Sequence, residues 1–346
     1  GAPRQWKAWG VTGVFSGCGG EEARPFREAA AALSSRGYRV ATIDVSGRSG
    51  TEFNAAQIKA ALAAEPPPPG VAVLLIGYSK GANDILEFLV RYPESAAQVA
   101  AVVSVAGPIF GTPLTDLARG AYDGIVDGVM RGKCGPGDGE VVDSLSPAAR
   151  ATWMADHPLP TEPRYFSLAS FTTRDRVAVA LVPAWKWLVR REPRSDGQLL
   201  ARDMLIPGAT LLGYPWTDHW SVALDVETLH PTLGARRDPA PFPRAALLEA
   251  ILLQVGDALA GDAAQAAGSD KVAAVPPPLP QLMARCDAPV YASDQQVCSD
   301  PVLRALDQRL ALLLVEVGAD ADRLPEPQAD WFRRRSLCAF AEQRTR

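Results

Sequence analysis

The stretch of sequence that decides the fold is VAVLLIGYSKGAN, residues 71–83. Its apolar run has the length and residue types of a strand that is buried on both faces. Apolar residues then recur with helical spacing at Ile85, Leu86, Leu89 and Val90. Ser79 lies between the two patterns and is flanked by Gly77 and Gly81, which are small enough for the backbone to reverse direction sharply. The stretch therefore predicts a buried strand, a tight turn that carries a serine, and a helix.

Other strand and helix patterns alternate along the chain around this stretch. Strands are expected at residues 8–15, 38–45, 71–76, 99–105, 165–170 and 209–213. Helices are expected at residues 23–35, 57–64 and 244–259, besides the one that follows Ser79. Strands that alternate with helices at this spacing form a parallel sheet with right-handed crossovers. The expected fold class is therefore α/β, a mostly parallel sheet flanked by helices.

The chain divides into a large and a small part. Residues 1–260 are expected to form the larger, α/β domain, in which residues 115–160 are either a cap over the sheet or a plain surface excursion. A tryptophan-bearing segment, residues 182–188, is expected to be a loop or short helix near the functional site. Residues 261–280 are small, polar and proline-rich, which is typical of a linker. Residues 281–346 then predict a small helical domain, with helices at 303–317 and 331–342.

Composition and charge exclude several functional classes. The 346 residues are 47% hydrophobic and 21% charged, which is typical of a globular protein with a sizeable core. The net charge of −4 predicts no basic field for nucleic acid or an anionic membrane. No apolar run approaches the ~20 residues of a membrane-spanning helix. No signal-peptide pattern begins at Gly1, which is compatible with a mature or trimmed form.

The five cysteines are distributed unevenly. Cys18 and Cys134 are far apart, whereas Cys286, Cys298 and Cys338 lie close to the C-terminus. Three cysteines in a small segment indicate a disulfide-stabilised module and an oxidising compartment. No histidine follows Cys286, so the spacing does not fit zinc. The pairing is left open by the sequence.

A serine nucleophile needs a base, and His219 is the best candidate. Where a serine lies in such a strand-to-helix turn, the acid and then the histidine follow it along the chain. His219 comes after the last expected strand and downstream of Ser79. His157 lies in the cap region and His230 precedes a proline in a loop, so both are expected to be surface histidines.

The acid that orients the histidine is expected to be Asp196. It lies in the turn-type sequence Arg-Ser-Asp-Gly, where a short carboxylate can reach an imidazole. Asp175 and Asp203 are the alternatives; Asp175 lies closer to the end of its strand. Asp218, adjacent to His219, is expected to hold the loop.

Two backbone amides are needed to stabilise a developing oxyanion. Lys80 is expected to supply one, because its amide opens the helix after Ser79 and the helix dipole favours negative charge there. The glycine-rich loop 16–20 follows the first strand and lets backbone amides approach a substrate closely. Cys18 in this loop is the expected second donor, and a role for its thiol as the nucleophile is disfavoured.

Residues 5–260 resemble an α/β-hydrolase of the bacterial lipase/esterase group. The matching motifs are Ser16–Gly20, where serine replaces the usual histidine; Gly77–Gly81; Ala106–Asp116; Ser195–Gly197; and Asp218–His219. The resemblance implies an α/β-hydrolase fold with Ser79, Asp196 and His219 as the triad. It also assigns the oxyanion amide to Cys18.

Residues from about 282 to 346 resemble a second family, the lysozyme inhibitor LprI-like domains of bacterial envelope proteins. The matching residues are Arg285–Cys286, Val297–Pro301, Leu303, Leu306–Leu310, Trp331, Arg335 and Cys338. This resemblance implies a helical, disulfide-bonded module in an oxidising compartment.

Together these features predict a secreted or periplasmic serine ester hydrolase that forms an acyl-enzyme on Ser79 and requires no metal or cofactor. The substrate is expected to be a small-molecule or lipid ester, and the C-terminal module is expected to meet an envelope protein. Two alternatives stay open. One is an acyltransferase or phospholipase that acts on envelope lipids with the same triad. The other is a non-catalytic envelope-binding protein.

Overall fold

The computed structural model describes residues 6–14, 21, 24–116, 137–268, 284, 286, 292–301, 303–305 and 307–308. The chain divides into two compact units. Unit 1 comprises Gly1–Ile206 and Leu212–Asp257, and unit 2 comprises Pro207–Leu211 and Ala258–Arg346.

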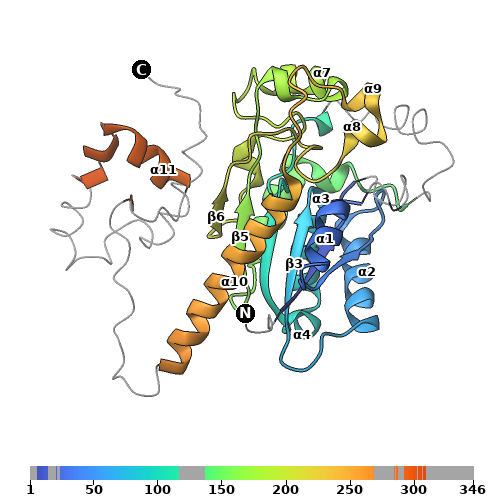
Figure 1. Ribbon diagram of the computed structural model, residues 1–346, viewed down its shortest axis with the longest axis vertical. Coiled ribbons are helices and arrows are strands. Elements are labelled where there is room, and N and C mark those ends of the chain that lie inside the picture. The colour runs from blue at the N-terminus through green and yellow to red at the C-terminus, as the bar shows by residue number, and fades with distance from the viewer. Residues whose placement is uncertain are drawn as a thin grey trace. The chain divides into compact units, whose positions relative to one another are not determined.

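A six-stranded sheet organises the fold, with the strand order β2-β1-β3-β4-β5-β6. The strands are β1 (Trp6–Val11), β2 (Val40–Ile43), β3 (Ala72–Tyr78), β4 (Val99–Val105), β5 (Arg164–Leu168) and β6 (Thr210–Gly213). The pairs from β2 to β5 are all parallel. A parallel strand needs a crossover, and the crossovers bring helices against the sheet (Figure 1). The expected mostly parallel sheet flanked by helices is therefore confirmed.

The helices vary from one turn to several turns. They are α1 (Arg27–Ser34), α2 (Thr51–Ala64), α3 (Lys80–Arg91), α4 (Pro93–Ala96), α6 (Pro147–Asp156), α7 (Val182–Leu188), α8 (Val226–Leu229), α9 (Pro231–Gly234), α10 (Arg244–Gly268) and α11 (Ala292–Ser299). Short 3₁₀ helices lie at Asp143–Leu145, Arg174–Arg176, Val179–Leu181 and Ala201–Met204. Within the described residues, no helix is both long and apolar enough to cross a bilayer.

The core of unit 1 forms around β3, β4 and α3. The four apolar residues Val73–Ile76 of β3 are at most 3% exposed, and Ile85, Leu86, Phe88 and Leu89 of α3 are fully buried. Strands that are covered on both faces read as continuous apolar runs, and this is why β3 could be recognised in the sequence.

Three elements differ from the sequence expectation for identifiable reasons. β1 ends at Val11 rather than residue 15, because the chain leaves the sheet and passes Ser79 at Gly13. α2 begins at Thr51 rather than residue 57. Its first residues include Thr51 and Asn54, which are polar yet buried, so the spacing of apolar residues does not indicate this part of the helix. α10 continues to Gly268, through an alanine-rich segment of high helix propensity that was expected to begin the linker.

Part of the expected cap lies within the described residues. α6 belongs to it, and its Arg150 is 2% exposed and donates from Nε to the Ile109 carbonyl at 3.1 Å. Residues 117–136 lie outside the described residues, so the choice between a cap and a surface excursion stays open.

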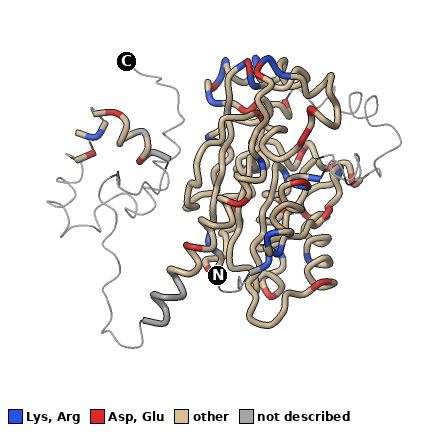
Figure 2. Tube along the Cα trace, in the orientation of Figure 1, with Lys and Arg blue, Asp and Glu red and all other residues tan. Residues whose placement is uncertain are grey.

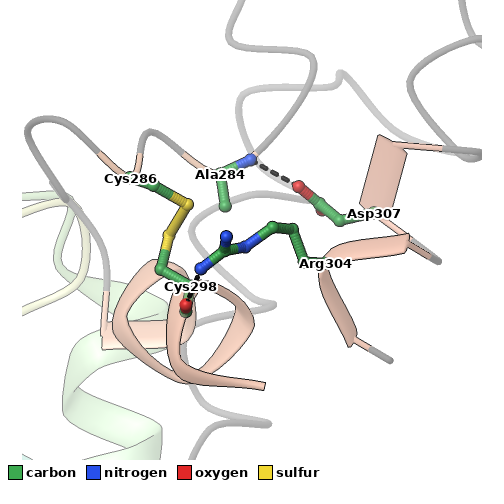
Figure 3. Close-up of a disulfide and its surroundings, with 5 residues drawn as sticks. All are labelled: Ala284, Cys286, Cys298, Arg304 and Asp307. Carbon is green, nitrogen blue, oxygen red and sulfur yellow. Dashed lines mark hydrogen bonds between the residues drawn. A yellow bond between two sulfur atoms is a disulfide. The ribbon is translucent and has the colours of Figure 1, made fainter. Parts of the chain in front are cut away.

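Unit 2 contains a disulfide between Cys286 and Cys298, with a Cα–Cα distance of 5.4 Å (Figure 3). Two further contacts hold the chain near this bond. The Asp307 carboxylate accepts from the Ala284 amide at 2.5 Å, and the Arg304 guanidinium donates to the Cys298 carbonyl. The expected helical, disulfide-bonded module is therefore present in its described part. Cys338 and the helix expected at 331–342 lie outside the described residues.

Candidate active site

The turn after β3 holds Ser79 in a strained conformation. Its φ is 53° and its ψ is −132°, which residues other than glycine rarely adopt. A Cβ at Gly81 would lie 2.5 Å from the Val11 carbonyl oxygen, and one at Gly77 would lie 2.4 Å from the backbone of the first turn of α3. Both positions therefore require glycine. The strain places the Ser79 side chain at the carboxyl end of the sheet, where α3 begins at Lys80.

Ser79, His219 and Asp196 form a continuous chain of hydrogen bonds. The distance from Ser79 Oγ to His219 Nε2 is 2.9 Å, and the distance from His219 Nδ1 to Asp196 Oδ2 is 2.7 Å. The tautomer that satisfies both contacts carries its proton on Nδ1 and accepts the serine hydroxyl at Nε2. His219 and Asp196 are buried, and Ser79 is 9% exposed. The geometry matches that of a serine nucleophile, a base and an orienting acid.

Both oxygens of Asp196 are satisfied by the surrounding structure. Oδ1 accepts the amides of Gln198 at 2.9 Å and Leu199 at 2.8 Å, which fixes the turn. Oδ2 accepts the Ser170 hydroxyl at 2.9 Å in addition to the imidazole. The carboxylate is therefore held rigidly toward His219. Ser170 was missed by the sequence reasoning, since a lone serine at the end of a strand pattern carries no signal of this contact.

Tyr78 and Asp218 hold the loop of His219. The Tyr78 hydroxyl donates to the His219 carbonyl at 2.7 Å, and the two rings lie 5.5 Å apart. Burial raises the pKa of Tyr78 well above its ordinary value, so the hydroxyl keeps its proton and stays a donor. Asp218 accepts the amides of Ala178 and Ser221, each at 2.7 Å. The residue before the turn serine thus positions the histidine, which the sequence did not indicate.

The first turns of α3 contain a buried ion pair. Lys80 Nζ lies 2.5 Å from Asp84 Oδ1, and each side chain is 1% exposed. Asn54 of α2 donates to Asp84 Oδ2 at 2.9 Å. Burial raises the pKa of Asp84 to about 6, against the opposing effects of Lys80, Asn54 and Arg150. The ion pair links the turn of Ser79 to α2, and nothing in the sequence pattern distinguished it from a solvated i, i+4 pair.

The alternative candidates lie apart from this arrangement. Asp175 is exposed near Arg237, and the Asp203 carboxylate lies 3.6 Å from Arg202 Nε. The His157 ring stacks on Trp153, with 4.9 Å between centroids. His230 is exposed at the end of α8.

The oxyanion donors are described in part. Lys80 is the first residue of α3, where an amide has no acceptor within the helix. Cys18 and its glycine-rich loop lie outside the described residues. Within the described residues, no group of three or more His, Cys, Asp or Glu side chains could hold a metal ion.

A parallel sheet flanked by helices, with a strained serine between β3 and α3, defines the α/β-hydrolase class. Comparison with solved structures narrows this class. The metagenomic carboxyl esterase MGS0156 is 36% identical, with a TM-score of 0.68, over 74% of this chain and 77% of that chain. The chain therefore belongs to the carboxyl esterase family of carboxylic ester hydrolases.

The Bacillus licheniformis lipase BlEst2 shares the fold at lower identity. Its mature form is 24% identical, with a TM-score of 0.51, over 63% of this chain and 86% of that chain. Its propeptide form is 22% identical, with a TM-score of 0.54, over 68% of this chain and 51% of that chain. No family model matches the chain, and no match was found among curated proteins.

Proposed function

We propose that the protein hydrolyses carboxylic esters through an acyl-enzyme on Ser79, with His219 as general base and Asp196 as the acid that orients it. The observation that carries this proposal is the unbroken hydrogen-bond chain from Ser79 Oγ through His219 to Asp196 Oδ2. Membership of the carboxyl esterase family supports the same reaction class.

In the first half of the reaction, Ser79 Oγ attacks the ester carbonyl carbon while its proton passes to His219 Nε2. Through its hydrogen bond to His219 Nδ1, Asp196 stabilises the imidazolium that this transfer forms. The tetrahedral intermediate then collapses, and His219 returns the proton to the departing alkoxide. In the second half, water attacks the acyl-enzyme with His219 as base, and Ser79 is released with the carboxylic acid.

The oxyanion of each tetrahedral intermediate is stabilised by the amides of Lys80 and Cys18. The Lys80 amide opens α3, where the helix dipole adds favourable charge. Removal of one such donor typically raises the barrier by about 3–4 kcal/mol. We therefore assign these two amides the largest electrostatic contribution to the reaction.

Replacement of the nucleophile tests the proposal. Ser79→Ala is expected to abolish turnover of p-nitrophenyl butyrate, and a fluorophosphonate probe is expected to label Ser79 in the parent protein. Ser35→Ala is the matched control, since Ser35 is exposed and its hydroxyl donates only to the Ala32 carbonyl at the end of α1. Retained turnover in Ser79→Ala, or labelling at another residue, would refute the assignment.

We further propose that residues from about 282 to 346 form an LprI-like module and that the protein acts in the periplasm or outside the cell, where the module meets an envelope protein. The disulfide between Cys286 and Cys298 supports an oxidising compartment. Peptide mapping of the native protein without reductant tests the location. Free thiols at both cysteines in protein from its own cells would contradict it.

A further inference from the structure

An exposed surface on and beside α7 combines apolar and basic side chains. We name it the α7 surface, and its members are Val179, Pro183, Lys186, Trp187, Arg190 and Arg191. Val179 is 47% exposed, although it is a large aliphatic residue, and Trp187 is half-buried. The surface therefore presents apolar groups and cations side by side.

The charge of this region is opposite to that of the chain. Residues 174–194 contain six lysines and arginines and two carboxylates, whereas the whole chain carries −4. Figure 2 shows several Lys and Arg segments at the end of unit 1 that carries α7. Among the described residues, neither Lys186 nor Arg190 forms a salt bridge. The net charge of the chain predicted no basic field for an anionic membrane, but it is a sum over all residues and does not reveal that residues 174–194 are positively charged.

Arg191 and Trp187 are coupled within the surface. The guanidinium carbon of Arg191 lies 3.3 Å from the centroid of the Trp187 ring, and its Nη1 donates to the Trp187 carbonyl at 3.2 Å. An aromatic ring beside a cation suits the interface between lipid headgroups and acyl chains, where one side of a residue is apolar and the other is wet.

α7 and the residue before it, Leu181, pack against the turn that carries Asp196. A Cβ at Gly197, next to Asp196, would lie 3.2 Å from the side chain of Leu181, which ends the 3₁₀ helix before α7. Trp185 of α7 donates from Nε1 to the Thr172 carbonyl at 3.2 Å. β5 runs parallel to β4 and β3, so the chain leaves β5 toward α7 at the carboxyl end of the sheet, where Ser79 also lies. A lipid layer bound at α7 would thus lie at the end of unit 1 that carries Ser79 (Figure 1).

We propose that the α7 surface docks on anionic lipid surfaces and that esters within such lipids are a substrate class of the enzyme. The substrate part rests on the proposed function, whereas the docking part does not. Each lysine or arginine near an anionic membrane surface strengthens binding, and exposed apolar side chains add to it by insertion. Nucleic acid would also attract the cations, but it would leave the exposed Val179 and Pro183 without an apolar partner.

Binding is tested in the Ser79→Ala protein, so that no hydrolysis takes place. The probes are vesicles of phosphatidylglycerol and phosphatidylcholine in equal parts, and vesicles of phosphatidylcholine alone. Reversal of two charges, Lys186→Glu with Arg190→Glu, is expected to lower partitioning onto the anionic vesicles at least about thirtyfold. The matched control is Arg39→Glu with Lys59→Glu, which changes the charge equally at two exposed residues on β2's amino side and on α2. This control is expected to bind like its parent.

Equal binding by both double variants, or equal binding to the two vesicle types, would overturn the docking proposal. Binding of single-stranded RNA in place of vesicles, with the same dependence on Lys186 and Arg190, would overturn it as well. With Ser79 intact, the substrate part predicts that the ratio of vesicle-ester to p-nitrophenyl butyrate turnover falls only in the α7 variant. Loss of butyrate turnover in Ser79→Ala tests the proposed function separately.

Discussion

The buried pair between Lys80 and Asp84 offers a quantitative test of what holds the nucleophile turn. We consider Lys80→Met, which leaves the Asp84 carboxylate 1% exposed with the Asn54 amide as its remaining direct donor. Breaking a buried pair by removing one partner typically costs about 3–5 kcal/mol. Replacing both partners, in Lys80→Met with Asp84→Leu, removes the stranded charge as well. The double variant is therefore expected to be at least as stable as the single one, although it differs from the parent at two positions.

The cost of Lys80→Met depends on pH in a defined direction. The pKa of Asp84 is about 6 in the folded protein, above its ordinary value, so the folded state holds the proton more tightly than the unfolded chain. Ionisation of Asp84 therefore lowers the free energy of unfolding as the pH rises from about 4 to about 6. Without the Lys80 ammonium the pKa rises further, and the loss continues above pH 6. The deficit of Lys80→Met is expected to be small at pH 5 and to approach its full size at pH 8.

Urea unfolding followed by circular dichroism measures this difference through the midpoint at constant m-value. Arg237→Met is the matched control, because Arg237 pairs with Asp175 at 3.8 Å and both side chains are well exposed, at 70% and 64%. Exposed pairs contribute about 0–1 kcal/mol, so this variant is expected to unfold like the parent at both pH values. A cost below about 1 kcal/mol for Lys80→Met at pH 8, or a double variant less stable than Lys80→Met at that pH, would refute the reasoning.

Three further outcomes follow from individual residues. Asp196→Asn is expected to lower kcat for ester hydrolysis by a factor on the order of 10³–10⁴, because the histidine loses the acceptor that sets its tautomer; an unchanged kcat would exclude this role. Gly81→Ala is expected to destabilise the protein by about 1–3 kcal/mol, since its Cβ would lie 2.5 Å from the Val11 carbonyl oxygen. The Cβ of Gly261→Ala in α10 would meet nothing within 4 Å, so this variant is expected to stabilise the protein by about 0.5–1 kcal/mol. Melting temperatures equal to that of the parent protein would contradict both expectations. Burial raises the pKa of Asp203 to about 6, so its ionisation lowers the free energy of unfolding by up to about 3 kcal/mol between pH 4 and 6. Asp203→Asn is expected to make the dependence of the urea midpoint on pH shallower over this range, while the contribution of Asp84 stays, and an unaltered slope would count against it.

The sequence by itself determined the elements whose patterns are local. The run before Ser79 is apolar because β3 is covered on both faces, and the flanking glycines follow from a turn that excludes a Cβ. Residues 99–105 and 182–188 form the expected strand and the short helix α7, since apolar periodicity and composition act within a few residues. Chain order also placed Asp196 and His219 downstream of the serine as the preferred acid and base.

Only the tertiary structure decided which of these residues meet. Ser79 and His219 are 140 residues apart along the chain, and their contact depends on where the last loop returns to the sheet. The choice of Asp196 over Asp175 and Asp203 likewise required the turn that Ser170 and two amides hold in place. Hydrogen bonds and charges act through space, so no periodicity along the chain carries them. The same reason explains why the buried pair in α3 was invisible in the sequence, and why the net charge of −4 hid the basic surface of α7.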